Sequence, residues 1–429
     1  MEFEKPNLLS KEASVLLWLQ GKDAWNEWAK NNPDMGVDFS GVKFSIPDLL
    51  KIAPNNKVLL ETNAKGDFSN LTFVNYIFPN VADFSNTEFN IPAIFDNATF
   101  KETVDFSRAI FSQDASFNNV AFNSIASFHS AEFQNSVVFG DCDFKGNTLF
   151  TCSHFEMLAY FPSTTFNEVV GFDHSTFAGG THFKNTKFLC KEVYFEYIDC
   201  TDTFNFDELD AKKVITLSFK GSVFEKDFNI SGYFKCIPDL RSTKLNHHTD
   251  LTSMVYTLNR KNIFFTPIKK ATDTLDIGRL CRLKELAEQN KSHDMALAFH
   301  ADELRAKRWS RLNIIQSVMD IIYSVISNYG QSIMRPLLLI AISFLLFNSY
   351  IISKSDIEIK SAYKPAATLS IATITPFLSI SKEAREHGAQ VLFEKQLPEN
   401  FYLYSYAYAS SSFVFLFLIG LGLRNRFRI

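Results

Sequence analysis

Phenylalanines divide the middle of the chain into short segments of fixed length. They recur at alternating steps of five and six residues, so the pattern has a period of eleven. Two positions before each of them stands a small residue or a valine, as at Ala82, Thr87 and Ala93. A fixed internal period of this kind is typical of a solenoid. The twenty phenylalanines, the expected structural core, are Phe84, Phe89, Phe95, Phe100, Phe106, Phe111, Phe117, Phe122, Phe128, Phe133, Phe139, Phe144, Phe150, Phe155, Phe161, Phe166, Phe172, Phe177, Phe183 and Phe188.

The same pattern excludes a helix in this part of the chain. An α-helix turns by about 100° per residue, so steps of five and six would scatter the rings around its axis. A short extended segment followed by a tight corner instead places each Phe and the small residue two before it on one side. The pattern therefore predicts stacked short strands with the rings inside, where each small residue leaves room for a neighbouring ring.

This arrangement of large and small positions resembles the pentapeptide-repeat family, in a Phe-rich variant with mixed steps of five and six. Blocks such as VADFSNTEF and HSAEFQNSVVF carry the resemblance, which extends over roughly residues 37 to 234. The resemblance implies a mainly-β solenoid: a right-handed, four-sided parallel β-helix with stacked Phe in its interior. Because the steps alternate, we expect a coil of about twenty-two residues.

The pattern becomes irregular at both ends. Phe68, Phe73 and Phe78 keep steps of five before the regular part, and the register slips after Phe188. Open ends of a solenoid need a cover, and helix formers with three tryptophans predict one near the N-terminus. The expected domains are a helical cap at 1–36, the β-helix at 37–235 with regular units at about 82–190, a linker or C-terminal cap at 236–272, a helical hairpin and amphipathic helix at 273–330, and a two-span membrane domain at 331–429.

Two uncharged apolar runs predict transmembrane helices at about 333–353 and 401–423. The alternative for each is a buried core helix. The N-terminal start is polar and acidic, so no signal peptide is expected. Basic residues before the first run and after the second favour an orientation with both termini inside. In a bacterial cell this predicts a two-span inner-membrane protein with both termini in the cytoplasm. The basic residues are Arg305, Lys307, Arg308, Arg311 and Arg335, then Arg424, Arg426 and Arg428.

Two further apolar segments accompany the spans. Residues 314–326 carry seven Ile and Val side chains on one side. This amphipathic helix either lies in the membrane interface or packs against the hairpin. The second segment, residues 366–380, lies between the spans. We favour an interfacial helix on the outer leaflet there over a re-entrant pore segment.

Composition and motifs exclude the common kinds of catalytic site. The formal net charge is −4, and the chain has no glycine-rich phosphate loop, nucleophile elbow or paired Cys/His metal spacing. The six cysteines show no disulfide framework and fit reduced thiols. Surface or packing roles are expected for His129, His154, His174, His182, the pair His247–His248 and the pair His300–Glu303. We therefore expect no enzyme, no cofactor and no bound metal.

Three functions fit these features, and the preferred one is a non-enzymatic membrane-anchored scaffold. Its cytosolic β-helix would present an interaction surface to an unidentified protein partner, with membrane lipid around the spans and homo-oligomerisation left open. The second is an oligomeric two-span ion channel or pore gated by the β-helix. Its pore would use small hydroxyls and a ring of the second span, residues that equally mark helix–helix contact: Ser410, Ser411, Ser412 and Phe415.

The third function comes from the family resemblance, since some pentapeptide-repeat proteins mimic DNA and inhibit topoisomerases. Acidic residues outnumber basic ones along the repeats up to Phe177. An ordinary solubilising surface explains this more simply, and a nucleic-acid partner is not expected. The acidic residues are Glu88, Asp96, Glu102, Asp105, Asp114, Glu132, Asp141, Asp143, Glu156, Glu168 and Asp173.

Overall fold

A computed structural model describes residues 7–56, 72–247, 249–251, 253–262, 269–374, 379–393 and 396–427. Phe68, His248, Arg428 and residues 375–378 of the apolar segment between the spans lie outside this description. The chain divides into two compact units, residues 1–306 and 307–429. Each unit is described by itself.

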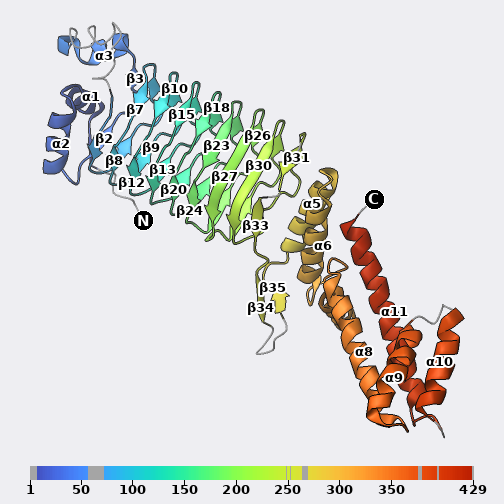
Figure 1. Ribbon diagram of the computed structural model, residues 1–429. Coiled ribbons are helices and arrows are strands. Elements are labelled where there is room, and N and C mark those ends of the chain that lie inside the picture. Colours follow the sequence, from blue (N-terminus) through green and yellow to red (C-terminus); the bar gives the residue numbers. More distant parts are fainter. Residues whose placement is uncertain are drawn as a thin grey trace. The chain divides into compact units, whose positions relative to one another are not determined.

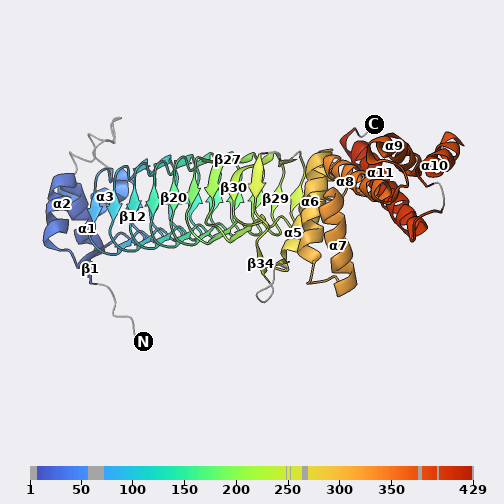
Figure 2. The same cartoon turned by 60° about the horizontal axis from the view of Figure 1, so that its bottom comes forward.

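The first unit is built on a parallel β-solenoid with four ladders of strands (Figures 1 and 2). Most strands have two residues, and each pairs with the strand 22 residues further along, as Ala82 with Val104 and Val104 with Ala126. One strand residue points inward and the other outward, which follows from the alternation of side chains along a strand. The predicted parallel solenoid is confirmed, with the expected coil length.

The four ladders are named faces A to D. Face A contains β1 (Leu8–Leu9), β2 (Gly36–Asp38), β5 (Ala82–Asp83), β9 (Val104–Asp105), β13 (Ala126–Ser127), β17 (Thr148–Leu149), β21 (Val170–Gly171), β25 (Glu192–Tyr194) and β28 (Thr216–Ser218). Face B contains β3 (Lys43–Phe44), β6 (Glu88–Phe89), β10 (Ile110–Phe111), β14 (Glu132–Phe133), β18 (His154–Phe155), β22 (Thr176–Phe177), β26 (Asp199–Cys200), β29 (Val223–Phe224) and β31 (Lys244–Leu245).

Faces C and D join into one sheet near the C-terminal end of the solenoid. Face C contains β7 (Ala93–Ile94), β11 (Ala115–Ser116), β15 (Val137–Val138), β19 (Ala159–Tyr160) and β23 (Thr181–Lys184). Face D contains β4 (Ile77–Phe78), β8 (Thr99–Phe100), β12 (Ala121–Phe122), β16 (Asp143–Phe144), β20 (Thr165–Phe166) and β24 (Lys187–Phe188). The strands in the joined region are β27 (Phe204–Ala211), β30 (Phe228–Phe234), β32 (Thr249–Asp250) and β33 (Met254–Tyr256).

Two kinds of corner explain the alternating steps of five and six. After Phe84, Asn86 adopts a left-handed conformation with φ 55°, and the N–H of Thr87 donates to the carbonyl of Phe84 at 3.2 Å. A left-handed residue recurs every eleven residues from Asn75 to Asn185. Asparagine tolerates this conformation better than most residues do. The six-residue steps between Phe89 and Phe177 contain no left-handed residue. With one residue more, the chain turns these corners without the tight left-handed turn.

The rings fill the interior as four columns. Each of the twenty repeat phenylalanines is at most 1% exposed. Within a column the rings lie almost parallel, as for Phe106 and Phe128, whose centroids are 5.0 Å apart at an interplanar angle of 9°. Rings of different columns meet edge to face, as for Phe128 and Phe139 at 5.4 Å and 83°. The separation within a column follows the spacing of hydrogen-bonded strands, which is about 4.8 Å.

The small inward residues are of two kinds. Some, such as Ala98 and Ala109, are apolar, and others carry a hydroxyl. The Ser153 hydroxyl donates to the carbonyl of Phe128 at 2.6 Å, and the Thr186 hydroxyl donates to that of Phe161 at 2.7 Å. A buried hydroxyl without a partner would cost stability. Each of these hydroxyls meets that need with a carbonyl of the preceding coil.

The slip after Phe188 comes from longer coils. Phe195 stacks on Phe172 at 4.7 Å, which makes this coil 23 residues long. Cys200 occupies the position that pairs in register with Phe177, so the column of rings that contains Phe177 has no ring at this coil. Phe204 contacts Phe177 at 5.4 Å and Phe224 at 5.5 Å, both edge to face. The Phe204 ring therefore fills the volume next to Cys200.

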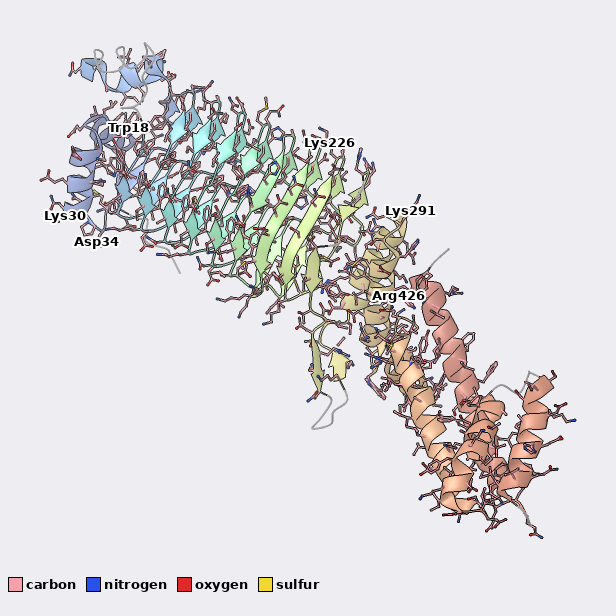
Figure 3. All side chains as sticks on the ribbon, in the orientation of Figure 1. Trp18, Lys30, Asp34, Lys226, Lys291 and Arg426 are labelled. Atoms are coloured by element: carbon pink, nitrogen blue, oxygen red, sulfur yellow. The ribbon has the colours of Figure 1, made fainter. Side chains whose placement is uncertain are left out.

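Helices cover the N-terminal end of the solenoid. They are α1 (Lys11–Leu19) and α2 (Lys22–Asn31), and α3 (Ile46–Ile52) and the 3-10 helix η1 (Pro54–Asn56) follow. Trp18 stacks on Phe73 at 5.3 Å, and its indole N–H donates to the carbonyl of Thr72 at 3.1 Å (Figure 3). Trp25 donates in the same way to Ile77 at 2.9 Å. These bonds satisfy carbonyls at the open end of the first described coil.

The parallel pairing continues past residue 235, where the sequence pattern ends, as far as Tyr256. A short antiparallel hairpin follows, β34 (Arg260–Asn262) with β35 (Lys269–Ala271). Helices α5 (Asp276–Gln289) and α6 (His293–Lys307) then pack against the last coils. Their break at residues 290–292 is where the sequence predicts it.

The second unit is helical, with α7 (Ile314–Ser327), α8 (Met334–Lys354), α9 (Ile359–Ile374), α10 (Ser379–Leu392) and α11 (Phe401–Arg426). Helices α8 and α11 are candidate membrane spans, with mean hydropathies of 2.0 and 1.7 over their most apolar parts. They run antiparallel, since Phe347 stacks on Tyr408 at 4.4 Å and Tyr350 contacts Tyr404 at 4.8 Å. The predicted interfacial segment lies mainly on α9, which packs on α8 and α10.

Candidate functional site

The outward residues of the solenoid form one row along each face. Adjacent strands are about 4.8 Å apart, so each row offers a partner side chains at a regular spacing. Face B is charged at both ends and mixed between them, with Lys43, Glu88, Ile110, Glu132, His154, Thr176, Asp199, Val223 and Lys244. Face C carries more apolar side chains, with Ile94, Ser116, Val138, Tyr160, His182 and Asn205.

Acidic residues on and next to face A accept hydrogen bonds from backbone N–H groups at its corners. Asp83 accepts a hydrogen bond from the backbone N–H of Ser85 at 2.8 Å, and Asp105 accepts one from Ser107 at 2.8 Å. Asp173 accepts from the N–H of Glu196 at 2.8 Å. Burial raises the pKa of Asp173, and this hydrogen bond partly offsets the rise. These carboxylates stabilise turns, so their presence on the repeats needs no nucleic-acid-like role.

An apolar patch interrupts the polar surface at the middle of face C. We call Val138, Met157, Leu158 and Tyr160 the Tyr160 patch. Met157 is 52% exposed and Leu158 38% exposed. Val138 pairs with Tyr160 across adjacent strands, and the N–H of Val137 donates to the carbonyl of Leu158 at 2.8 Å. Val138 and Tyr160 are held by paired strands of face C, and Met157 and Leu158 lie in the corner just before β19, so four apolar side chains lie close together on the surface.

The histidines of the solenoid have local partners. His154 contacts Glu156 at 2.8 Å, and the nitrogen of His129 lies 2.8 Å from the hydroxyl of Thr151. His174 stacks on Tyr197 at 5.2 Å. Among the described residues, no group of three or more His, Cys, Asp or Glu side chains is arranged to hold a metal ion. His247 is described, whereas its neighbour His248 is not.

The pair His300–Glu303 belongs to the packing of the C-terminal helices. The side chain of Glu303 is only 5% exposed and accepts a hydrogen bond from Lys284 at 2.9 Å, which links α6 to α5. The His300 ring lies 3.7 Å from the same carboxylate. Lys284 and Glu303 thus form a partly buried ion pair between the two helices.

All six cysteines are free thiols in the structure. Burial raises the pKa of Cys190 to about 11 and that of Cys236 to about 12. Burial also raises the pKa of Cys142. Since the thiolate is the nucleophilic form, these buried thiols are unreactive at neutral pH.

The four residues that the sequence singles out on the second span do not share one environment. Ser410 is exposed, Phe415 is half-buried, and Ser411 donates to the carbonyl of Tyr408 at 3.0 Å within its own helix. Ser412 is fully buried. It lies on the face of α11 that also carries Ser405 and Tyr408, at the spacing of a helical stripe.

Sequence reasoning identified serines of this inward stripe but missed Tyr408 and the polar groups that face the stripe from other helices. The hydroxyls of Ser405, Tyr408 and Ser412 are buried, and none has a hydrogen-bond partner among the described residues. The same holds for the Asn348 carbonyl oxygen on α8 and the Ser370 hydroxyl on α9. The spacing of 405, 408 and 412 could have revealed the stripe, but the partner helices could not be read from spacing.

Two cavities border α11. One of about 510 Å³ lies between α9, α10 and α11, and Leu369, Arg385 and Ser405 contribute to its wall. The other, of about 620 Å³, lies between α8 and α11 beside Tyr350, Tyr404 and Tyr408. Both are surrounded mainly by apolar and aromatic side chains.

Comparison with known proteins identifies the repeats. Residues 73–121 and 106–154 match the family described as pentapeptide repeats (9 copies). No curated protein and no solved structure matches the chain.

Proposed function

Since the chain carries a pentapeptide-repeat β-solenoid together with two candidate membrane spans, we propose that it is a non-enzymatic, membrane-anchored scaffold. The β-solenoid presents its faces to a protein partner, and α8 and α11 hold the chain in the bilayer. The observation that carries this proposal is the filled interior. Four columns of rings occupy the inside of the solenoid, so recognition falls to the outward rows.

The Tyr160 patch is the part of those rows best suited to a protein partner. Aromatic residues and methionine are enriched in protein interfaces, and an exposed apolar group with a polar rim is typical of them. Val138 and Tyr160 of the patch are on paired strands, and the corner that carries Met157 and Leu158 is hydrogen-bonded to β15 through the carbonyl of Leu158, so little backbone entropy is lost when a partner binds.

Site-specific photo-crosslinking in cells tests this surface. A photoreactive residue in place of Tyr160 should cross-link a discrete protein. The matched position Thr165, which points outward from the neighbouring face D, should not. The double substitution Met157→Lys and Leu158→Lys should abolish the cross-link while the protein stays folded. Equal cross-linking from both positions would contradict a specific surface at Tyr160.

The antiparallel packing of α8 and α11 supports the expected topology. It brings the start of α8 and the end of α11 together, and Asn425 donates to the carbonyl of Gly330 at 3.0 Å at that end. Arg335, Arg424 and Arg426 lie at the same end of the pair. By the positive-inside rule, both termini are cytoplasmic in a bacterial inner membrane.

An oligomeric ion channel is the second candidate, and the inward stripe of α11 favours it. Polar groups inside a membrane span need a partner from water or from another helix. The buried hydroxyls of Ser405 and Ser412 and the oxygen of Asn348 lack one among the described residues. Several copies could bring these groups to a common wet path.

Ion flux in liposomes separates the two candidates. The scaffold predicts no flux above that of empty liposomes. A channel predicts conductance that disappears on Ser412→Leu, whose side chain would fill the polar stripe. The control Ser410→Leu, at an exposed position of the same helix, should then leave the conductance intact. Reproducible flux with this selectivity would overturn the scaffold.

A further inference from the structure

The exposed face of helix α7 is apolar, which is unusual for a helix that faces water. Six of its fourteen residues are large apolar side chains with exposures from 44% to 76%. They fall on one face, at helical spacing: Ile314, Ile315, Val318, Met319, Ile322 and Val325. A surface helix of a water-soluble domain turns its apolar side to the core instead.

The opposite face of α7 is polar and packs inward. Ser317 and Ser327 are fully buried. The Ser317 hydroxyl accepts from the N–H of Trp309 at 3.2 Å, and the Ser327 hydroxyl accepts from the N–H of Gly330 at 3.0 Å. The polar side of the helix therefore meets specific partners in its own unit.

An ion pair fixes this orientation. The side chain of Asp320 is 8% exposed, and the guanidinium of Arg308 donates to its carboxylate. The hydroxyl of Tyr329 lies 3.1 Å from the same carboxylate and accepts from Arg308 at 2.7 Å. Rotating α7 to hide its apolar face would break this cluster and leave buried charges unpaired.

The length of α7 and its neighbours in the chain indicate its level relative to a bilayer. Fourteen residues of helix measure about 21 Å, which is too short for the roughly 30 Å core of a bilayer. Asn328, Tyr329 and Gly330, with φ of 48°, 58° and 75°, turn the chain from α7 into α8. This corner is bonded to the end of α11 through Asn425, so α7 lies beside the ends of both candidate spans.

Basic residues lie at both ends of α7. Arg311 precedes α7 and is exposed, and Arg335 donates to the carbonyl of Ser324 at 3.0 Å. Burial raises the pKa of Tyr323 on α7, and the charge of the nearby Arg424 partly offsets the rise. The acidic group on α7, Asp320, is neutralised by Arg308. A positive rim therefore accompanies the apolar face.

We propose that α7 lies in the lipid interface, with its apolar face in the acyl-chain boundary and its basic rim at anionic head groups. An amphipathic helix with these features binds the plane of a membrane, and arginines near its surface are attracted to anionic lipid. The inference rests on the proposed membrane anchoring, because it uses α8 and α11 to set the level of α7. The occupant of the exposed face is a bilayer containing anionic lipid.

Lipid quenching of a fluorescent probe tests the proposal in the full chain. Single cysteines carrying an environment-sensitive dye replace Met319 on α7, Leu338 on α8 and Gln134 on the solenoid, in a background with Cys152→Ser and Cys281→Ser. The protein is reconstituted in phosphatidylcholine vesicles with or without about one quarter phosphatidylglycerol, a level at which anionic lipid attracts basic residues. Lipids that carry a nitroxide near the head group quench the dye.

We expect at least about twofold quenching at Met319 and at Leu338 and none at Gln134, because only the first two contact acyl chains. Quenching at Leu338 without quenching at Met319 overturns the inference and leaves the anchor intact. Cross-linking between Met319 cysteines of two copies, in place of quenching, assigns the face to a dimer and also overturns it. No quenching at Leu338 refutes the membrane anchor itself.

The anionic part of the proposal has its own comparison. Quenching at Met319 should be stronger in vesicles with phosphatidylglycerol, and Arg311→Gln should remove that difference. The matched change Lys244→Gln, on the last strand of face B, should leave that difference unchanged. Equal quenching in both kinds of vesicle would refute a role for the basic rim.

Discussion

A phenylalanine in the middle of the solenoid is held by rings above, below and beside it. Phe128 stacks between Phe106 at 5.0 Å and Phe150 at 4.7 Å, and its edge contacts Phe117 and Phe139. Backbone hydrogen bonds fix the distance between coils. The neighbours therefore cannot move together when one ring is removed.

Phe128→Ala is expected to lower the free energy of unfolding by about 3–5 kcal/mol, because the cavity cannot collapse. Gln134→Lys, at an exposed outward position of the next corner, should change it by less than about 0.5 kcal/mol. Thermal unfolding of the two purified variants measures both effects. Similar losses from the two substitutions would show that the inward positions are assigned incorrectly.

The left-handed corners hold residues that are poorly suited to them. Arg108 has φ 56° and an exposed side chain, whereas the two preceding left-handed corners carry Asn86 and Asn97. A left-handed conformation costs most side chains about 1–2 kcal/mol, and asparagine less. This cost is part of the native state and disappears in the unfolded chain.

Arg108→Asn is therefore expected to stabilise the protein by about 0.5–1 kcal/mol, seen as a higher unfolding temperature. Lys101→Asn serves as the control, since Lys101 is exposed and does not have a positive φ. A gain at Lys101 equal to that at Arg108 would point to charge rather than backbone conformation.

At the scale of elements, the C-terminal helices are joined to the last coil by an ion cluster. Arg279 on α5 lies 3.3 Å from Asp239, 2.7 Å from Asp273 and 2.9 Å from Asp276. Arg241 also pairs with Asp239 at 2.6 Å. Burial opposes the ionisation of Asp239, but hydrogen bonds from Arg241 and the charges of both arginines hold its pKa below the ordinary value.

Asp276 depends more heavily on Arg279. Burial raises the pKa of Asp276, and the hydrogen bond from Arg279 limits the rise. A carboxyl whose pKa is raised in the folded state opposes folding above its unfolded pKa, and this penalty is relieved as the pH falls through the folded pKa. Removing Arg279 raises that pKa further and enlarges the penalty at neutral pH.

Arg279→Met is expected to cost about 3–5 kcal/mol near neutral pH, because it leaves a buried carboxylate without its partner. The deficit relative to the wild type should shrink as the pH is lowered through the raised pKa of Asp276, because protonation of this carboxyl relieves the penalty. Thermal unfolding at several pH values measures the trend, with Lys244→Met as an exposed control on the last coil. A deficit independent of pH would contradict this assignment.

The elements themselves were predictable to different degrees. The break between α5 and α6 and the positions of both apolar helices follow from local periodicity and composition. The strands beyond residue 235 did not, because β32 and β33 lack the repeated Phe and form by pairing with β30. The position of the Phe204 ring beside Cys200 was likewise not predictable, because it depends on contacts with other coils, such as that with Phe177.

At the scale of the whole molecule, the two candidate spans determine on which side of the membrane each segment lies. A cysteine at Glu386, on α10 between the spans, should react with an impermeant maleimide added to intact cells. A cysteine at Glu132 on the solenoid should react only after permeabilisation, in the same background without Cys152 and Cys281. Labelling at Glu132 in intact cells would reverse the orientation, and the absence of the protein from membranes would refute the anchor.

The sequence by itself determined the solenoid, its coil length and the inward residues. Those properties repeat every eleven residues. Each unit therefore has the same inward and outward positions, and it packs against neighbours with the same pattern. It also determined the two apolar helices, since length and lack of charge are local properties. Only the tertiary structure decided the ion cluster around Arg279, the inward stripe of Ser405 and Ser412, and the outward apolar face of α7. Each of these depends on which distant element packs against a residue, and no period in the sequence encodes that choice.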